Sequence, residues 1–356
     1  MTLPRKYLAP ADGEFKRDRS VFGTFAEDSP DLCAQMLEKD EAQGKLARVC
    51  KVEKTKKAVM GVLQTHYVEL KNIFQDLVAK SGSTEPTLGM TELTQFAYTC
   101  KILDGTLNLV TFDRIFTATS APTNKQKPAG EKRLHRYEFI EMLVRLAQAK
   151  YADKITDTSK KRYAYQQNAE PSLTLADLLQ SFITKDLLPN IKMFDYHGLR
   201  HQHIYQNKVD ELLRKNEMVI TKLYNAFVVP PSQHLAISQV SGFVSAAKLN
   251  IASKQLNICL IWCQMSRVDT LADLQQPQSL RHVEFLMFIC MLAHQIYLGT
   301  KQAQLELHLK VDEILGPLLK LVGERKKFTF AKKGKADDHG SDFDDADLDR
   351  ELAGGN

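Results

Sequence analysis

One segment of this 356-residue chain occurs twice. Residues 133–151 read RLHRYEFIEMLVRLAQAKY, and residues 279–297 read SLRHVEFLMFICMLAHQIY, 146 positions further on. Both copies carry a glutamate directly before a phenylalanine, Glu138–Phe139 in the first and Glu284–Phe285 in the second. Such a repeat constrains the fold to one that contains two related units.

Three further blocks precede this segment in the same order in each half. YVELKNIFQDLVA, LGMTELTQFAYTCKIL and LVTFDRIFTAT match NEMVITKLYNAFVV, LAISQVSGFVSAAKLN and LNICLIWCQMS. In the second pair, Leu88, Phe96 and Lys101 align with Leu235, Phe243 and Lys248 at an offset of 147. Apolar residues recur at helical spacing, and no sustained alternation marks a strand. The pattern predicts an all-α fold with two copies of a unit of about 90 residues. Each copy is made of two helix–loop–helix pieces.

Breaks in the pattern divide the chain. Ser29–Pro30 is typical of a helix start, and SGSTEP at 81–86 is typical of a helix end. Between them, one helical face carries Val59, Leu63, His66, Leu70, Ile73 and Leu77. We expect an extended N-terminal arm (1–30), a first helical lobe (31–151), a linker with helices (152–216), a second lobe with a C-terminal helix (217–324), and a basic run with a disordered acidic tail (325–356).

Composition favours a globular intracellular protein. Apolar residues make up 44% and charged residues 26% of the chain, which is ordinary for a soluble domain. No apolar run is long enough to span a membrane, and the N-terminus has no apolar core of signal-peptide type. The cysteines lack CxxC spacing and lie in apolar helical patterns, which predicts buried, reduced thiols: Cys33, Cys50, Cys100, Cys259, Cys263 and Cys290.

Charge is unevenly placed. Residues 337–351 carry eight acids and one arginine, whereas the whole chain has a net charge of +5, so the remainder is strongly basic. The run RKKFTFAKKGK at 325–335 adds to this charge directly before the tail. A basic body favours an acidic partner such as an acidic protein polymer or a nucleic acid.

The repeated helix–loop–helix order resembles the EF-hand (calmodulin-like) superfamily. In such a loop a central apolar residue pairs with the partner loop, and a closing glutamate follows it. The resemblance covers 67–151 and 217–297, about half of the chain, and lies in helix order and in the loop-to-helix junction. It implies two EF-hand pairs in tandem, similar to the tandem degenerate EF-hand-like proteins of flagellated and ciliated protists.

The four loops lack the ligands that calcium requires. Calcium loops supply carboxylates at positions 1, 3 and 5, glycine at 6 and glutamate at 12. No loop here offers more than two of these carboxylates, and none has glycine at position 6. The residues at positions 1, 3, 5, 6 and 12 are Ser81, Ser83, Glu85, Pro86 and Glu92; Lys127, Ala129, Glu131, Lys132 and Glu138; Val228, Pro230, Ser232, Gln233 and Gln239; Asp273, Gln275, Pro277, Gln278 and Glu284. We therefore expect no metal site and no cofactor.

The two closing glutamates have another role in this interpretation. A carboxylate in the first turn of a helix accepts hydrogen bonds from free backbone amides and meets the positive end of the helix dipole. We expect Glu138 and Glu284 to do this, with Phe139 and Phe285 entering the core.

Other motifs carry little chemistry. The pair His197 and His201 has Gly198 between its members and no third ligand, and Cys259 with Cys263 lies in an apolar run. Residues 345–349 imitate the start of a calcium loop, but Arg350 stands where glycine is required. No phosphate-binding loop, metalloprotease motif or nucleophile elbow is present. The sequence therefore predicts a protein that is not an enzyme and has no small-molecule substrate.

An open EF-hand pair offers an apolar groove to a partner helix. Six residues of the repeated segment are candidates to line it, unless they close the core of their own unit: Met142, Leu143, Leu146, Phe288, Ile289 and Leu292. The helical segment at 297–322 is a candidate to fill such a groove within the same chain.

We expect a non-catalytic structural or adaptor protein of a large assembly. The resemblance and the basic body favour ciliary or flagellar axonemal microtubules, with tubulin as partner and the N-terminal arm lying along a neighbour. A calcium-responsive regulator that binds target helices is the alternative. A subunit of an RNA-containing or organellar complex is the second alternative, and no membrane partner is expected.

Overall fold

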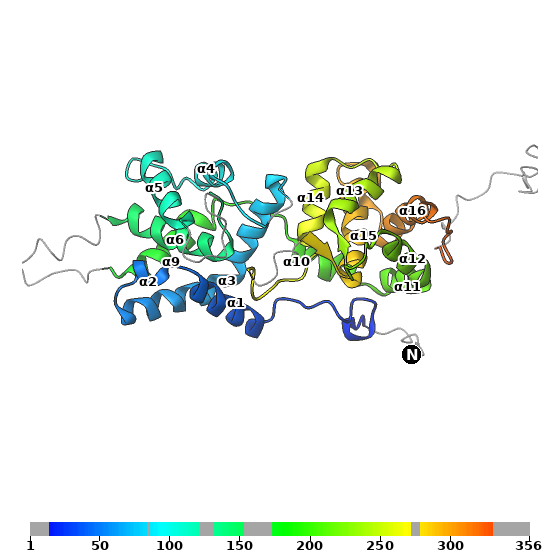
Figure 1. The fold of residues 1–356 in the computed structure, drawn as a ribbon, viewed down its shortest axis with the longest axis horizontal. Coiled ribbons are helices and arrows are strands. Elements are labelled where there is room, and N and C mark those ends of the chain that lie inside the picture. The colour runs from blue at the N-terminus through cyan, green and yellow to red at the C-terminus, as the bar shows by residue number, and fades with distance from the viewer. Residues whose placement is uncertain (1–13, 84–85, 122–131, 153–172, 272–277, 330–356) are drawn as a thin grey trace, which may run out of the picture.

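The computed structural model describes residues 14–83, 86–121, 132–152, 173–271 and 278–329. The fold is all-α, as the sequence predicts, and the strands among these residues are two segments of two residues each. Figure 1 shows two groups of helices side by side along the long axis of the molecule. Helices α3 (Glu53–Ser81) and α14 (Ser253–Trp262) pack against each other where the groups meet.

The first group follows the predicted helix boundaries closely. The Ser29 side chain accepts a hydrogen bond from the Leu32 amide and starts α1 at Pro30, whereas Gly82 ends α3 in the left-handed conformation that glycine adopts without strain. The other helices of the group are α2 (Leu46–Val49), α4 (Met90–Thr99), α5 (Leu109–Ser120), α6 (Arg136–Lys150) and α9 (Leu175–Ser181), and α1 ends at Gln43.

The second group has the corresponding order. Its repeated part comprises α12 (Glu217–Phe227), β1 (Leu235–Ala236), α13 (Ile237–Ala246), α14, β2 (Ser279–Leu280) and α15 (His282–Tyr297). Around it lie α10 (Tyr196–Leu199), α11 (Asn207–Lys215) and α16 (Leu307–Lys320), with a π-helical turn at η4 (Arg200–Ile204) and a 3-10 turn at η6 (Lys301–Gln304). The π-helical turn η3 (Phe182–Leu187) follows α9 and packs against it in the first group.

The loops of each half pair in the same way. Leu88 and Leu134 exchange both backbone hydrogen bonds, at 2.9 and 2.7 Å. In the second half, β1 and β2 are antiparallel, with Leu235 opposite Leu280. The two leucines that pair in the first half are therefore the counterparts of the two that pair in the second half.

The ends of the aligned helices α4 and α13 also match. Lys101 and Lys248 both have φ of 54°, and they are the non-glycine residues with positive φ in the described chain. Directly after them, the amides of Ile102 and Leu249 donate to carbonyls five residues back. Because a left-handed lysine is strained, the same departure at both positions shows that the local geometry is duplicated with the sequence.

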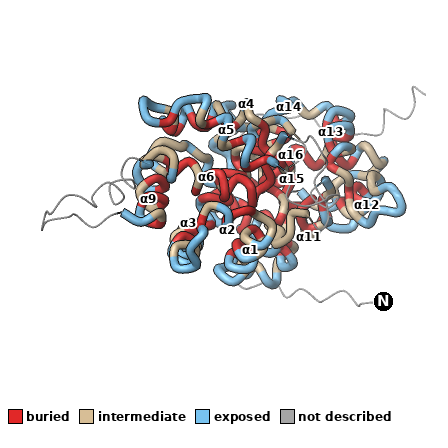
Figure 2. The backbone as a smooth tube through the Cα atoms, turned by 60° about the vertical axis from the view of Figure 1, so that its left-hand side comes forward, coloured by how far each residue is buried: buried red, intermediate tan, exposed pale blue. Residues whose placement is uncertain are grey.

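One continuous core fills the molecule. Phe139 packs against Phe74 and Phe96, and the equivalent Phe285 packs against Tyr224 and Phe243. Figure 2 shows buried backbone concentrated in α6 and α15, the two copies of the segment that first revealed the repeat. All six cysteines are buried and free, as predicted.

The described part of the N-terminal arm packs against its own chain. From residue 14 on, it lies along its own chain, because Phe22 and Phe25 are buried and the Val21 amide donates to Asp210 in α11 at 2.7 Å. The Arg214 side chain also donates to the Arg19 carbonyl. Residues 14–29 thus contact both halves of their own chain, through Asp210 of the second half and Lys71 of the first, whereas 1–13 lie outside the described residues.

The predicted linker belongs to both groups of helices. Helix α9 packs against α3 and α6, whereas α11 packs against α12 and α16. Helix α16 packs against α15, so this segment does lie on its neighbour within the chain. The start of the basic run is also held, because the Asn216 side chain accepts from the amides of Lys327 and Phe328. The acidic tail lies outside the described residues.

Candidate functional site

The two closing glutamates cap their helices, which confirms their predicted role. Glu138 accepts from the His135 amide at 2.9 Å, and Glu284 accepts from the Arg281 amide at 2.7 Å. Glu284 also accepts from the Met265 amide at 2.8 Å, a contact across the loop between α14 and α15 that the sequence did not indicate. Both carboxylates are buried, and both oxygens of Glu284 accept from backbone amides.

The third loop, at 228–239, is fully described and contains no carboxylate. In the other loops, the residues at seven of the predicted positions lie outside the described residues: Glu85, Lys127, Ala129, Glu131, Asp273, Gln275 and Pro277. Among the residues that are described, no group of three or more His, Cys, Asp and Glu side chains is placed to hold a metal ion.

The six candidate groove residues lie in the core. Their side chains are at most 1% exposed: Met142, Leu143, Leu146, Phe288, Ile289 and Leu292. In this conformation the six side chains do not line a groove open to a partner, because the helices of each unit and their neighbours already cover them. The alternative reading of the sequence, that they close the core of their own unit, is the observed one.

The histidine pair and the cysteine pair noted in the sequence also make packing contacts. The rings of His197 and His201 stack with centroids 5.3 Å apart. Cys259 and Cys263 are buried, and burial raises the pKa of both thiols. A protonated buried thiol is a poor metal ligand and a poor nucleophile.

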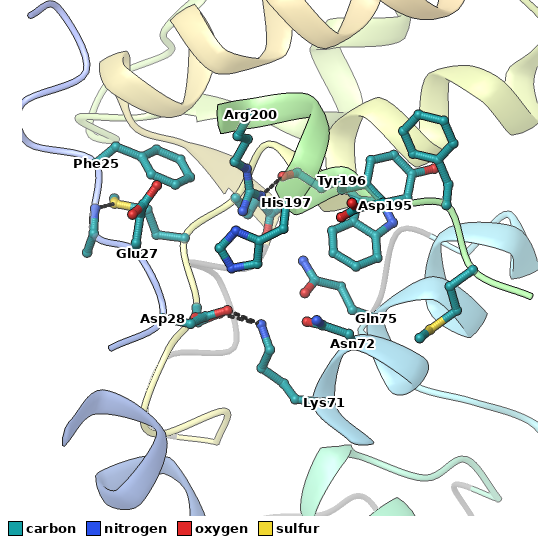
Figure 3. Close-up of a pocket in the computed structure, with 17 residues that line it drawn as sticks. Phe25, Glu27, Asp28, Lys71, Asn72, Gln75, Asp195, Tyr196, His197 and Arg200 are labelled. Carbon is teal, nitrogen blue, oxygen red and sulfur yellow. Dashed lines mark hydrogen bonds and ion pairs between the residues drawn. The ribbon is translucent and has the colours of Figure 1, made fainter. Parts of the chain in front are cut away.

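A cavity of about 220 Å³ lies between the two halves, and we refer to it as the central cavity. Its walls come from four segments that are far apart in the sequence: the arm at 25–28, one face of α3, residues 193–197 with Arg200, and residues within 262–266 (Figure 3). Each half therefore contributes to it, and the docked arm closes one side.

Lys71 enters the central cavity from α3. Its ammonium group forms a buried ion pair with Asp28 on the arm and donates to Ser266 at 3.1 Å. Burial lowers the pKa of Lys71. Burial also raises the pKa of Asp28, but the adjacent Lys71 outweighs it and leaves this pKa below its usual value. The pair joins the arm to the first half and leaves this part of the wall nearly neutral.

Arg200 enters from the opposite side. It is 7% exposed, its guanidinium donates to the Trp262 carbonyl, and it lies over the Phe25 ring at 5.2 Å. Among the described residues no carboxylate lies within 4.0 Å of it, and its Nε has no hydrogen-bond partner on the protein. Because nothing compensates the burial fully, the pKa of Arg200 is lowered. An arginine buried without a carboxylate is costly.

Aromatic rings form another wall. Tyr196 stacks on Trp262 with centroids 4.2 Å apart, and Phe194 packs against Tyr196. The indole Nε1 of Trp262 is buried and has no hydrogen-bond partner among the described residues. His197 stands between Arg200 and Asp28 in Figure 3, and burial together with Arg200 and His201 lowers its pKa.

Sequence reasoning missed the central cavity. One signal was present: Lys71 follows Leu70 and lies within a turn of Tyr67 and Phe74, so a cation sits on the apolar face of α3. Nothing comparable marks Arg200, because its burial depends on the arm and on α14.

Comparisons with known proteins give no further guide. No protein-family model, no curated protein and no solved structure matches the chain. Within the described residues, no helix combines the length and the apolar character needed to cross a lipid bilayer.

Proposed function

We propose that this chain is a non-catalytic structural or adaptor protein made of two tandem, degenerate EF-hand-like units. The observation that carries the proposal is the matched loop pairing, in which Leu88 with Leu134 and Leu235 with Leu280 are joined by backbone hydrogen bonds. Pairing of two loops through a central apolar residue is the resemblance noted above. The closing glutamates support the same proposal, because each accepts a hydrogen bond from a backbone amide at the start of its helix.

The proposed setting is a large assembly, with ciliary or flagellar axonemal microtubules as the first choice. Support comes from charge, since a net basic chain is attracted to an acidic polymer such as tubulin. The docked arm changes how this is tested. Removal of residues 1–30 would also remove Phe22 and Phe25 from the core, so the informative truncation is 1–13.

Microtubule co-sedimentation over a salt series tests this setting. We expect the full chain to pellet with microtubules at low salt and to be released as salt rises, because screening weakens surface charge attraction. Microtubules stripped of their acidic C-terminal tails are the matched control and should retain less protein. No pelleting at low salt would remove the microtubule proposal, and pelleting that single-stranded RNA abolishes would favour the RNA-containing complex.

Calorimetry with calcium tests the competing regulator. We expect no saturable heat at micromolar calcium, because the loops carry too few carboxylates to offset the dehydration of the ion. One or two micromolar sites would establish the calcium-responsive alternative. A fluorescent tag at the C-terminus, followed by microscopy, then distinguishes a cilium or flagellum from an organelle.

A further inference from the structure

The two repeated units meet through one pair of helices, which we refer to as the internal joint. Helix α3 of the first unit packs against α14 of the second. The Asn257 side chain donates to the Ala79 carbonyl at 3.4 Å, and the Gln75 side chain donates to the Ile261 carbonyl at 3.0 Å, so the two helices run antiparallel. The internal joint thus combines one face of the first helix of a unit with one face of the third helix of the next unit.

The repeat contains a second copy of each of these faces. Helix α12 aligns with the end of α3 at an offset of 150, because Tyr224 packs on Phe285 as Phe74 packs on Phe139. Helix α5 aligns with α14 at an offset of 147. The face of α3 at the internal joint therefore has its counterpart on α12, and the face of α14 has its counterpart on α5.

Both counterpart faces are exposed in the single chain. Val229, two residues after the end of α12, corresponds to Ala79 and is 56% exposed. Val110 of α5 corresponds to Asn257 and is 60% exposed, whereas Ala79 and Asn257 are buried at the internal joint. Further exposed residues lie on the same side of α12 at helical spacing: Met218, Lys222 and Asn225. Each unit therefore has one face covered by the other unit and one face that the described chain leaves uncovered.

The two uncovered faces are too far apart to meet within one molecule. Figure 1 shows α5 and α12 near opposite ends of the long axis. Two copies of the chain, however, offer one face of each kind to each other. Because the two faces are different patches, a contact between them is heterologous and leaves a free face at each end of the pair, to which further copies can add.

We propose that copies of this chain associate head to tail, with the α12 face of one copy packed against the α5 face of the next in the arrangement of α3 and α14. In this arrangement Val229 lies opposite Val110, as Ala79 lies opposite Asn257 within the chain. Burial of the two exposed valines favours the association.

The contact between copies is more polar than the internal joint. Asp113 and Arg114 are exposed on α5, whereas the corresponding Leu260 and Ile261 of α14 are buried. A more polar contact is typical of reversible association, so the assembly depends on protein concentration. Head-to-tail assembly goes beyond the proposed structural role and does not require microtubules.

Sedimentation velocity of the full chain alone, over a concentration series, measures the assembly. We expect the weight-average sedimentation coefficient to rise with concentration and to pass the value of a dimer, because every assembly keeps a free face at each end. A monomer at all concentrations, or a rise that stops at the dimer, would overturn the proposal. Since no microtubules are present, this result and the co-sedimentation result can fail separately.

Two variants block one face each. Val110→Glu places a charge on the α5 face and Val229→Glu places one on the α12 face, and each should weaken self-association by roughly tenfold or more. Val52→Glu, at a valine that is 61% exposed and lies on neither face, is the matched control and should assemble like the natural protein. All three side chains are exposed, so we expect the fold to persist, which circular dichroism checks.

A mixture of the two blocked variants tests the head-to-tail geometry directly. The Val110→Glu protein keeps its α12 face and the Val229→Glu protein keeps its α5 face, so the mixture should form a dimer that neither variant forms alone. If only one of the two substitutions weakens self-association, or if the mixture remains monomeric, the contact is not head to tail and the proposal is wrong.

Discussion

Helices α6 and α15, the last helix of each repeated unit, have similar sequences but make different contacts at their first residue. Arg136 in α6 forms a buried bidentate ion pair with Asp40, at 2.8 and 2.9 Å, and donates to the carbonyls of Arg267 and Val268 in the other half. His282 in α15 lies edge-on to Tyr224 and bonds Thr221, both within its own half.

This difference shows which residues are the same in both copies of the repeat and which differ between them. The residues shared by α6 and α15 face their own unit: the glutamate caps the helix and the phenylalanine enters the core. Arg136 faces outward to α1 and to the other half, a surface that α15 lacks at this position. A position whose neighbours lie outside the unit has different neighbours in each copy, so its residue type differs.

The largest expected effect is at this position. Arg136→Met leaves Asp40 buried without its cation, and we expect a loss of about 3–5 kcal/mol in the free energy of unfolding. Chemical denaturation followed by circular dichroism measures it. The aligned His282→Met should cost about 1 kcal/mol or less, because it removes one weak hydrogen bond. The pair Arg136→Met with Asp40→Leu should recover much of the loss. Equal costs in the two halves would show that the cross-half contacts contribute little.

The capping glutamates give the next effect. Glu284→Ala leaves the amides of Arg281 and Met265 without their carboxylate, and we expect a loss of about 2–3 kcal/mol. Glu138→Ala should cost about 1–2 kcal/mol by the same mechanism. Glu211→Ala, in an exposed pair with Lys215, is the control and should change stability by less than about 0.5 kcal/mol. If calcium protects the natural protein against thermal unfolding but not Glu284→Ala, the glutamate serves a metal and the comparison fails.

A pH difference distinguishes the C-terminal turns of the same two helices. His294 in α15 aligns with exposed Gln148 in α6. Burial, with Lys310 and His203, lowers the pKa of His294 from 6.5 to about 4. Above pH 6.5 the imidazole is neutral in both states. As pH falls towards 4, the unfolded chain gains a proton that the folded chain does not, so stability decreases, by up to about 3 kcal/mol at pH 4.

His294→Gln places the residue of the first copy in the second. We expect it to flatten the loss of stability between pH 6.5 and pH 4, while other histidines with lowered pKa values keep their share. Denaturation at several pH values measures the difference. Parallel curves for the natural protein and the variant would mean that His294 protonates equally in both states.

The smallest effect concerns the strained lysines. Lys101→Gly and Lys248→Gly each relieve a left-handed residue at φ of 54°. Glycine also makes the unfolded chain more flexible, so we expect a net gain of about 0.5 kcal/mol at each position. Thermal unfolding of the two variants tests whether the copies share this strain. A gain in only one of them would show that the matching dihedral angles differ in energy.

Much of the fold was predictable because its signals are local. The helix start at Pro30, the end of α3 at Gly82, the order of four helices in each repeat and the capping by Glu138 and Glu284 all follow from residues within a turn or two of each other. The partner groove did not follow. Met142 and Phe288 have the same apolar character whether a foreign helix or their own chain covers them.

The sequence by itself determined the helical class, the duplication and the shortage of carboxylates in the four loops, since spacing and side-chain chemistry are properties of short stretches. Only the tertiary structure decided where the arm docks, which half Arg136 contacts, and that Lys71 and Arg200 meet across one cavity. These features depend on residues up to 239 positions apart. An example is the Ala26 amide, which donates a hydrogen bond to the Met265 sulfur at 3.0 Å. Contacts at such separation are set by how whole helices pack, and no short stretch encodes them alone.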